Sequence, residues 1–565
     1  MSAPLRLWPG LDDAPGGLSV GRDLLVSCPA ARTVSVPQGV LLDDWLDMPA
    51  RVQVEERARE AARAWVSERR ETLTVQGTDL GWIWEIELYR DAFLAVERLL
   101  AAAIAAVEGL GAERLEVAGA DARTAAALVE ALAPLGCAVA LAGAPAELAV
   151  PEGLTSLSRA QRLMVASGLG APQRVLGQVL VVNAPTSAPV VAALARGGGL
   201  APVLDPASLP GLPMAELART LWRGGWVGVP GRVRRGRSAA MVGRALAAAR
   251  ELAPAHEPAA ELAHAHALEL LARRAQATLA LVDRCARALA KGRIGTVVVP
   301  FDSLASVRVL LAASRDAAVP SVLVQHGYAP EPNDPDKGEA DHTAAWAERD
   351  AREVRERHGR DATVTGNPAA PSARSRRRPA RGGPTLALLQ SPTVFSARWD
   401  ARVSQRFVAE SLAALGRVRP ASEVILRPHP LEPSPDAFLG LVPATSSLRA
   451  RVDVHTPLAE LLENCDACVG GVSTATLQAG VAGLTTAFLD VTGGPLPEPF
   501  DHAGALPSAR DAAGLADALG PALIDFAVAG QDELAEALGV VGEPSATARV
   551  LDLIQRLPQE AAASS

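Results

Sequence analysis

Three short motifs combine histidine, arginine, hydroxyl and glycine residues, and each follows an apolar run directly. They are LVQHGY (323–328), ILRPHP (425–430) and CVGGVSTATLQAGVAG (468–483). An imidazole can accept a proton near neutral pH, and a guanidinium group or a helix N-terminus can bind phosphate. The three motifs therefore predict acid–base chemistry combined with anion binding.

His326 is the candidate base in the first motif. It ends a strand predicted over 320–327 and is followed by Gly327, which permits a tight turn. A histidine at the carboxyl end of a strand can act as a general base or orient an acceptor. The alternative is a histidine that only supports its loop.

The other two motifs predict a phosphate site. Arg427 and His429 follow an apolar strand, and suit phosphate because arginine forms forked hydrogen bonds and histidine one directed bond. Ser473 and Thr474 open a helix after two glycines, where main-chain N–H groups and the helix dipole attract anions. The alternatives are a rigid proline turn and an ordinary helix N-cap.

These motifs need elements that bring them together, and the sequence predicts parallel sheets covered by helices. Strands and helices alternate, as expected for an α/β protein. Ligands of such sheets bind beyond the carboxyl ends of the strands, where the motifs lie. The predicted strands are 178–185, 294–303, 320–327, 385–390, 421–430, 451–457, 467–472 and 485–490. A long helical segment is expected over 238–291.

Three regions follow from this pattern. Residues 1–170 form an N-terminal α/β region of unknown role, with a strand at 113–120, a helix at 123–136 and a strand at 137–143. Trp82 and Trp84 alternate with isoleucines and are interpreted as a buried edge or packing seam. Residues 174–370 and 383–565 form two Rossmann-like domains, joined by a proline- and arginine-rich linker at 368–384.

The order of the motifs resembles bacterial transferases of the GT-B fold that synthesise surface carbohydrates. It runs QHG, then ADHTAAWAERD (340–350), VTGNP (364–368), RPHP and the Ser-Thr helix start. Similar families are the CDP-glycerol glycerophosphotransferases of teichoic acid synthesis and the bacterial polysialyltransferases. UDP-GlcNAc 2-epimerases share that fold and a TGN-type turn. The resemblance covers about 290–495.

The resemblance implies a metal-independent transferase without a cofactor. The domain at 174–370 would present the acceptor, with His326 as base, and the domain at 383–565 would hold the nucleotide donor. Donor phosphate would contact Arg427, His429, Ser473 and Thr474. His455, Gly471 and Gln478 would border the nucleotide and its ribose, although many GT-B enzymes have glutamate where this chain has Gln478.

Two other functions stay open. One is an epimerase of the same fold, which needs carboxylates such as Asp302 or Asp341 as acid and base. The other is a catalytically degenerate subunit that binds nucleotide or serves in assembly. The donor would be a nucleotide-activated sugar or alditol, and the acceptor a carbohydrate, a lipid-linked molecule or a protein.

Composition excludes several classes. The net charge of −8 over 565 residues argues against a nucleic-acid binder. Five cysteines, an odd number in a long chain, predict a reducing compartment and no disulfide framework. No signal peptide or membrane-spanning run is recognised, so a cytoplasmic protein is expected. The basic stretch at 231–238 leaves a peripheral contact with the inner membrane face open.

Two candidate metal sites are disfavoured by sequence. Cys465 and Cys468 form a lone C-x-x-C with no second ligand pair. His264 and His266 lie two residues apart on a predicted helix, hence on different faces.

Overall fold

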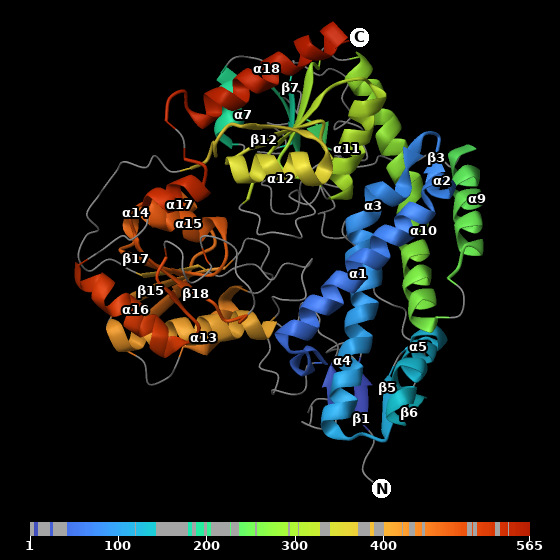
Figure 1. The fold of residues 1–565 in the computed structure, drawn as a ribbon, viewed down its shortest axis with the longest axis horizontal. Coiled ribbons are helices and arrows are strands. Elements are labelled where there is room, and N and C mark those ends of the chain that lie inside the picture. Colours follow the sequence, from blue (N-terminus) through green and yellow to red (C-terminus); the bar gives the residue numbers. More distant parts are fainter. Residues whose placement is uncertain are drawn as a thin grey trace.

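The chain forms three α/β regions (Figure 1). The computed structural model describes residues 5–8, 23–25, 42–118, 120–142, 179–182, 188–196, 200–204, 226–227, 237–254, 257–291, 294–302, 304–327, 339–370, 385–388, 401–420, 422–428, 435–442, 447–493, 500, 506–525, 531–540 and 542–564. Most of the linker predicted at 368–384, and nearly all of the basic stretch at 231–238, lie outside these ranges.

The N-terminal region contains a four-stranded parallel sheet with the order β2-β1-β5-β6. Its elements are β1 (Leu5–Trp8), β2 (Asp23–Leu25), β5 (Arg114–Ala118), α5 (Ala122–Leu132) and β6 (Ala138–Ala142). The predicted strand–helix–strand unit is confirmed. The helix ends earlier than predicted, in a 3-10 turn (Ala133–Leu135) that contains Pro134, because proline cannot donate the next helical hydrogen bond.

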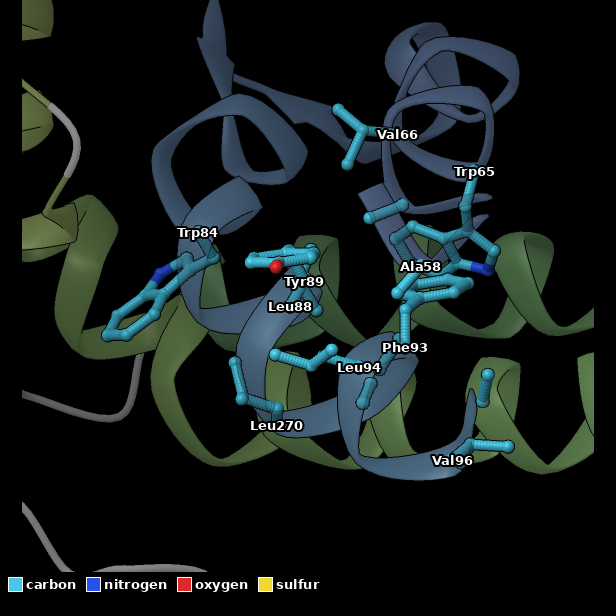
Figure 2. Close-up of a cluster of buried hydrophobic side chains, with 14 of the residues drawn as sticks. Ala58, Trp65, Val66, Trp84, Leu88, Tyr89, Phe93, Leu94, Val96 and Leu270 are labelled. Carbon is cyan, nitrogen blue, oxygen red and sulfur yellow. The ribbon is translucent and has the colours of Figure 1, made fainter. Parts of the chain in front are cut away.

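A block of helices connects this sheet to the rest of the protein. It comprises α1 (Met48–Glu68), α2 (Arg70–Leu73), a short hairpin of β3 (Thr74–Val75) and β4 (Thr78–Asp79), α3 (Leu80–Leu88), a π-helical segment (Tyr89–Leu94) and α4 (Ala95–Leu110). These helices share one apolar core with α10 (Pro258–Lys291) and α11 (Ala305–Asp316). Figure 2 shows Trp65, Trp84, Tyr89 and Phe93 in this core beside Leu270 of α10.

Trp82 and Trp84 lie in this block, on α3. Both are buried, at 8% and 9% exposure, so the predicted packing seam is confirmed. The alternation with isoleucines also fitted a strand edge, but the segment is a helix that is apolar almost all round. Such a helix is buried on every face, so neighbouring positions can both be covered.

The middle region is a seven-stranded parallel sheet with the order β13-β12-β11-β10-β7-β8-β9. Its strands are β7 (Val179–Val182), β8 (Leu200–Leu204), β9 (Trp226–Val227), β10 (Thr296–Val299), β11 (Ser321–Val324), β12 (His342–Ala345) and β13 (Asp361–Val364). Alternate residues face opposite sides, so Val297 and Val299 join the core with α10 and α11, whereas Val298 faces the other way. The sheet is therefore covered on both faces.

Helices of the middle region are α7 (Ala188–Arg196), α9 (Arg237–Glu251), α10, α11 and α12 (Glu348–His358). The long helical segment predicted over 238–291 is helical over most of its length, but it is divided into α9 and α10. Pro254 and Pro258 lie at the division, and Pro258 is the first residue of α10, where its missing N–H costs nothing.

The C-terminal region is a six-stranded parallel sheet with the order β16-β15-β14-β17-β18-β19. Its strands are β14 (Thr385–Leu388), β15 (Glu423–Arg427), β16 (Arg449–Val452), β17 (Ala467–Gly470), β18 (Thr485–Leu489) and β19 (Ser508–Ala509). Its helices are α13 (Ala401–Val418), α14 (Leu458–Asn464), α15 (Thr474–Val481), α16 (Ala512–Asp525) and α17 (Gln531–Ala537). α13 and α16 cover one face, and α14 and α15 cover the other.

The last helix, α18 (Ala546–Ser564), lies within the range predicted for the C-terminal domain but packs on the middle sheet. Val550, Leu553 and Ile554 join the apolar cluster on that sheet, and the Thr296 hydroxyl donates to the Ile554 carbonyl at 3.1 Å. The chain thus returns to the middle region at its end, as Figure 1 shows.

Two parallel-sheet α/β units and an additional N-terminal α/β region confirm the expected fold class. Within the described ranges, no helix has the length and apolar character that a membrane span requires.

Candidate functional site

His326 lies where the sequence predicted it, just beyond the carboxyl end of β11. The side chain is half-buried, and its ring packs edge-on against Phe301 with 5.5 Å between centroids. The preceding residue, Gln325, is only 3% exposed. Its amide donates to the Gly327 carbonyl at 3.1 Å, which fixes the turn that carries the imidazole.

The start of α15 is built tightly against β17. A Cβ atom on Gly470 would lie 2.1 Å from the Thr476 hydroxyl oxygen, so only glycine fits this position. That hydroxyl donates to the carbonyl of Gly471 at 2.7 Å. The main chain therefore turns sharply into α15, whose first N–H groups have no acceptor within the helix.

Ser473 is the N-cap of α15. Its hydroxyl oxygen accepts from the Thr476 N–H at 3.2 Å and lies 3.0 Å from the Thr476 hydroxyl. These contacts engage the serine within the helix start, as the N-cap alternative predicted. The main-chain N–H groups of the helix terminus are then better placed for an anion than the Ser473 hydroxyl.

The first and third motifs meet across the two sheets. A Cβ atom built on Gly327 would lie 3.8 Å from the Thr474 hydroxyl oxygen, in van der Waals contact. The turn after β11 thus faces the start of α15, and both lie at carboxyl ends of parallel strands. This is the edge at which such sheets bind ligands.

Trp346 helps to fix the position of the two sheets relative to each other. It follows β12 and is 1% exposed in a cluster with residues of the C-terminal region, namely Leu477, Val481, Phe488, Phe500, Leu506, Leu534 and Leu538. The nearby TGN turn adds a main-chain bond, from the Asn367 N–H to the Gly539 carbonyl at 2.8 Å. The ADHTAAWAERD and VTGNP motifs therefore lie at the junction of the two sheets.

Arg427 ends β15, as predicted, but its guanidinium is engaged by Asp453. It donates to the Asp453 carbonyl at 2.8 Å and lies 3.5 Å from the carboxylate. Burial lowers the pKa of Arg427, and the Asp453 carboxylate partly offsets this. In this arrangement the arginine stabilises the loop after β16.

Asp453 organises that loop. Its carboxylate accepts from the N–H groups of His455 and Thr456 at 3.1 and 2.9 Å, and from the Thr456 hydroxyl at 2.9 Å. Burial acts to raise the pKa of Asp453, but the bonds from Thr456, Arg451 and His455 outweigh it and lower the pKa to about 2. His455 is exposed in this turn.

The remaining predicted site residues are His429, Gln478 and Gly471. His429 lies outside the described residues. Gln478 lies half-buried on α15, one turn after Thr474, and Gly471 precedes the N-cap. The structure thus brings His326, Gly471, Ser473, Thr474 and Gln478 to one region, while Arg427 and His455 belong to the loop held by Asp453.

The carboxylates named for an epimerase are both engaged structurally. Asp302 is fully buried, and its carboxylate accepts from the N–H groups of Glu339 and Ala340 at 2.6 and 3.2 Å. Asp341 precedes β12 and accepts from the N–H and hydroxyl of Ser321, the first residue of β11. Asp341 therefore lies at the amino edge of the sheet, opposite His326.

Cys465, Cys468 and His264 are all buried. Burial raises the pKa of the Cys465 thiol to about 12, and burial also raises the pKa of the Cys468 thiol. The His264 ring instead accepts from the Trp65 indole N–H at 2.9 Å. In the part of the chain that the structure describes, no group of three or more histidine, cysteine or acidic side chains could hold a metal ion.

Sequence reasoning missed the residues that hold these motifs. Gln325 and Trp346 stood within quoted motifs, but no local pattern links positions 21 residues apart. The sequence did contain a signal for the turn at Asp453, because an aspartate two or three residues before polar N–H donors favours this type of turn.

No protein-family model and no curated protein matches the chain. Solved structures with a similar arrangement include UDP-GlcNAc 2-epimerase from Neisseria meningitidis, at 11% identity over 67% of this chain and 99% of that one, with a TM-score of 0.40. MurG from Acinetobacter baumannii has 12% identity over 67% and 99%, with a TM-score of 0.39. The wall teichoic acid polymerase TagF has 10% identity over 70% and 92%, with a TM-score of 0.40.

UDP-GlcNAc 2-epimerases and proteins of teichoic acid synthesis are both among the proteins that the sequence motifs resemble.

Proposed function

We propose that this chain is a metal-independent transferase that moves a sugar or glycerol-phosphate unit from a nucleotide-activated donor to a surface-carbohydrate or related acceptor. One observation carries the proposal: the His326–Gly327 turn of one sheet faces the Thr474 end of α15 in the other. A candidate base and a candidate phosphate site thus lie at one edge, where a transfer reaction needs both.

In this proposal the donor phosphate binds at the start of α15 and the acceptor hydroxyl gives its proton to His326. The leaving phosphate gains charge in the transition state, so the fixed N–H groups of a helix terminus stabilise it most at that point. His429 remains a proposed phosphate ligand, and Gln478 and His455 remain proposed contacts of the nucleotide.

Transfer is favoured over epimerisation by the positions of the carboxylates. Asp302 and Asp341 are committed to main-chain N–H groups and to Ser321, so neither is available as an acid or base beside His326. A catalytically degenerate subunit that serves in assembly is the second candidate. It is supported by Arg427 and Ser473, two predicted donor-phosphate ligands, because both are engaged within the protein.

The first experiment is a thermal-shift screen against UDP, CDP, CMP, GDP and dTDP. A ligand that binds the native state raises the melting temperature by mass action, so one selective nucleotide identifies the donor class. The absence of any response would contradict the transferase and support the degenerate subunit. Turnover of the corresponding donor, measured with and without added acceptor, then separates transfer from simple binding.

The second experiment replaces His326. We expect His326→Ala to leave nucleotide affinity nearly unchanged while turnover falls by about 10²–10⁴-fold, the usual contribution of a general base. The acidic limb of the pH–rate profile should disappear, because a protonated imidazole cannot accept a proton. Normal turnover in the folded variant would remove His326 from the mechanism.

A further inference from the structure

Gln325 makes hydrogen bonds that fix the His326 turn from both sides. Its side-chain amide donates to the Gly327 carbonyl at 3.1 Å, and its side-chain oxygen accepts from the Trp346 main-chain N–H at 2.9 Å. Its main-chain carbonyl accepts from the Trp346 indole N–H at 2.8 Å. The residue just before His326 and the residue just after it are therefore both restrained, and the turn is tied to Trp346.

The same Trp346 ring is part of the core that seats α15. It is 1% exposed and shares an apolar cluster with Leu477 and Val481, which lie on α15. The main chain at Gly539 also lies close to the main chain of Trp346, because a Cβ atom on Gly539 would lie 2.7 Å from the Trp346 carbonyl oxygen. One indole thus binds the His326 turn by its N–H and packs on the anion-binding helix by its ring.

These contacts give Trp346 a specific consequence for geometry. The His326 imidazole is part of a turn that hydrogen-bonds to Trp346. The proposed phosphate site is the start of α15, which packs on Trp346. The two groups that must act together are therefore located relative to a common side chain. A rigid reference of this kind is what positioning in catalysis requires, because small displacements of reacting groups are costly.

We propose that Gln325 and Trp346 are positioning residues, which set the orientation of His326 and its distance from the start of α15. The inference rests on the proposed function for the meaning of that distance. Neither residue contacts the substrates in this assignment: Gln325 acts through the His326 turn, and Trp346 acts through that turn and through its packing on α15.

The principal test is Trp346→Phe, which keeps an aromatic ring in the cluster and removes the indole N–H. The chain offers a matched control in Trp84→Phe. Trp84 is also buried, and its indole N–H donates to the Thr278 hydroxyl at 3.0 Å in the N-terminal core. The two variants lose the same kind of bond, and each loses ring volume, so a general effect of destabilisation should appear in both.

The first readout is histidine-selective NMR of the protein without any ligand. We expect the assigned His326 imidazole signals and their pH titration to change in Trp346→Phe and to match the wild type in Trp84→Phe. The His326 signal is assigned with the His326→Ala variant. Unchanged His326 signals in Trp346→Phe would overturn the inference, whatever the protein binds.

The second readout uses the nucleotide selected among UDP, CDP, CMP, GDP and dTDP. Trp346→Phe should leave its dissociation constant within about twofold of the wild type while turnover of the corresponding donor falls by about 10–100-fold, as expected for a misplaced reacting group. Equal losses in Trp346→Phe and Trp84→Phe would show a merely structural role and contradict the inference.

A second variant keeps the test decisive if Trp346→Phe does not fold. Gln325→Met retains the length of the side chain and removes both of its hydrogen bonds, and it should reproduce the change in the His326 signals. If no nucleotide binds the wild type, the proposed function fails, and the NMR comparison still decides whether these residues position His326.

Discussion

Glu87 allows a quantitative prediction of pH dependence. It lies on α3, and one carboxylate oxygen accepts from the Ala305 N–H at 3.1 Å, at the start of α11. The residue keeps partial exposure, but its second oxygen is buried without a hydrogen-bond partner among the described residues. Burial raises the pKa of Glu87 from 4.5 to about 7, against the opposing effects of the Ala305 N–H and of Arg90 and Arg308.

The sign of the effect follows from proton binding. Between pH 4.5 and about 7 the folded protein holds this proton and the unfolded chain releases it, so the free energy of unfolding falls as the pH rises. At about 1.4 kcal/mol per pKa unit, the change amounts to about 3 kcal/mol as an upper limit. The contribution is fully present below pH 4.5 and is lost as the pH rises through 7.

The substitution Glu87→Gln should remove this dependence. A glutamine keeps an oxygen acceptor for the Ala305 N–H and cannot ionise. Urea unfolding is followed by the fluorescence of the tryptophans in the core of Figure 2. Between pH 4.5 and 8, the free energy of unfolding of the variant should rise relative to that of the wild type by up to about 3 kcal/mol. Glu60→Gln, at an exposed position on α1, is the control. Parallel stability curves for Glu87→Gln and wild type would refute the reasoning.

Two further predictions concern stability. Gly539→Ala should destabilise the protein by about 1–3 kcal/mol, because φ is +70° and the new Cβ atom would overlap the Trp346 main chain. Gly542 has open space around it, so Gly542→Ala should change stability little. Urea unfolding measures both effects. Burial lowers the pKa of His264 to about 4, so the free energy of unfolding that its neutral ring contributes should be lost as the pH falls from 6.5 towards 4. The fluorescence of Trp65, whose indole N–H donates to this ring, should report the loss of stability. The variant His264→Gln should no longer show this loss.

The sequence predicted the sheets well because their strands are short apolar runs that stand out locally. β10, β11 and β17 are buried at every position, which is the pattern of a parallel strand covered on both faces. The strand ends then located His326 and Thr474 correctly. The α3 segment was ambiguous because a helix that is buried almost all round shows no distinct period over nine residues.

Other features depend on which distant residue a side chain meets, and periodicity carries no such information. Arg427 was predicted to meet phosphate, but its guanidinium donates to the main-chain carbonyl of Asp453 and lies 3.5 Å from the Asp453 carboxylate, 26 residues later in the loop after the neighbouring strand. The helix α18 follows the C-terminal sheet along the chain yet covers the middle sheet. Its amphipathic pattern predicted a helix with one buried face but could not say which sheet that face would meet.

The N-terminal region, whose role the sequence left open, supports the side of the site that carries His326. Arg308 on α11 is 3% exposed and donates to the Asp302 carbonyl at 2.9 Å. Its other bonds go to the Trp82 carbonyl and the Glu85 carboxylate on α3, at 2.5 and 2.9 Å. A buried guanidinium that loses its partners is strongly destabilising, so α11 depends on α3.

That dependence reaches the candidate site through the connection between β10 and α11. Glu87 binds the first N–H of α11, and Arg308 binds the carbonyl of Asp302, so both ends of the connection are held to or through α3. Phe301 lies in this connection, and its ring packs on the His326 imidazole at 5.5 Å. The imidazole is thus restrained on one side by the Trp346 junction and on the other by a segment that the N-terminal helices hold in place. Removing those helices would take away the acceptors of Arg308 on α3 and expose the apolar face of α11 that they cover, so the N-terminal region is part of the same fold and not a detachable module.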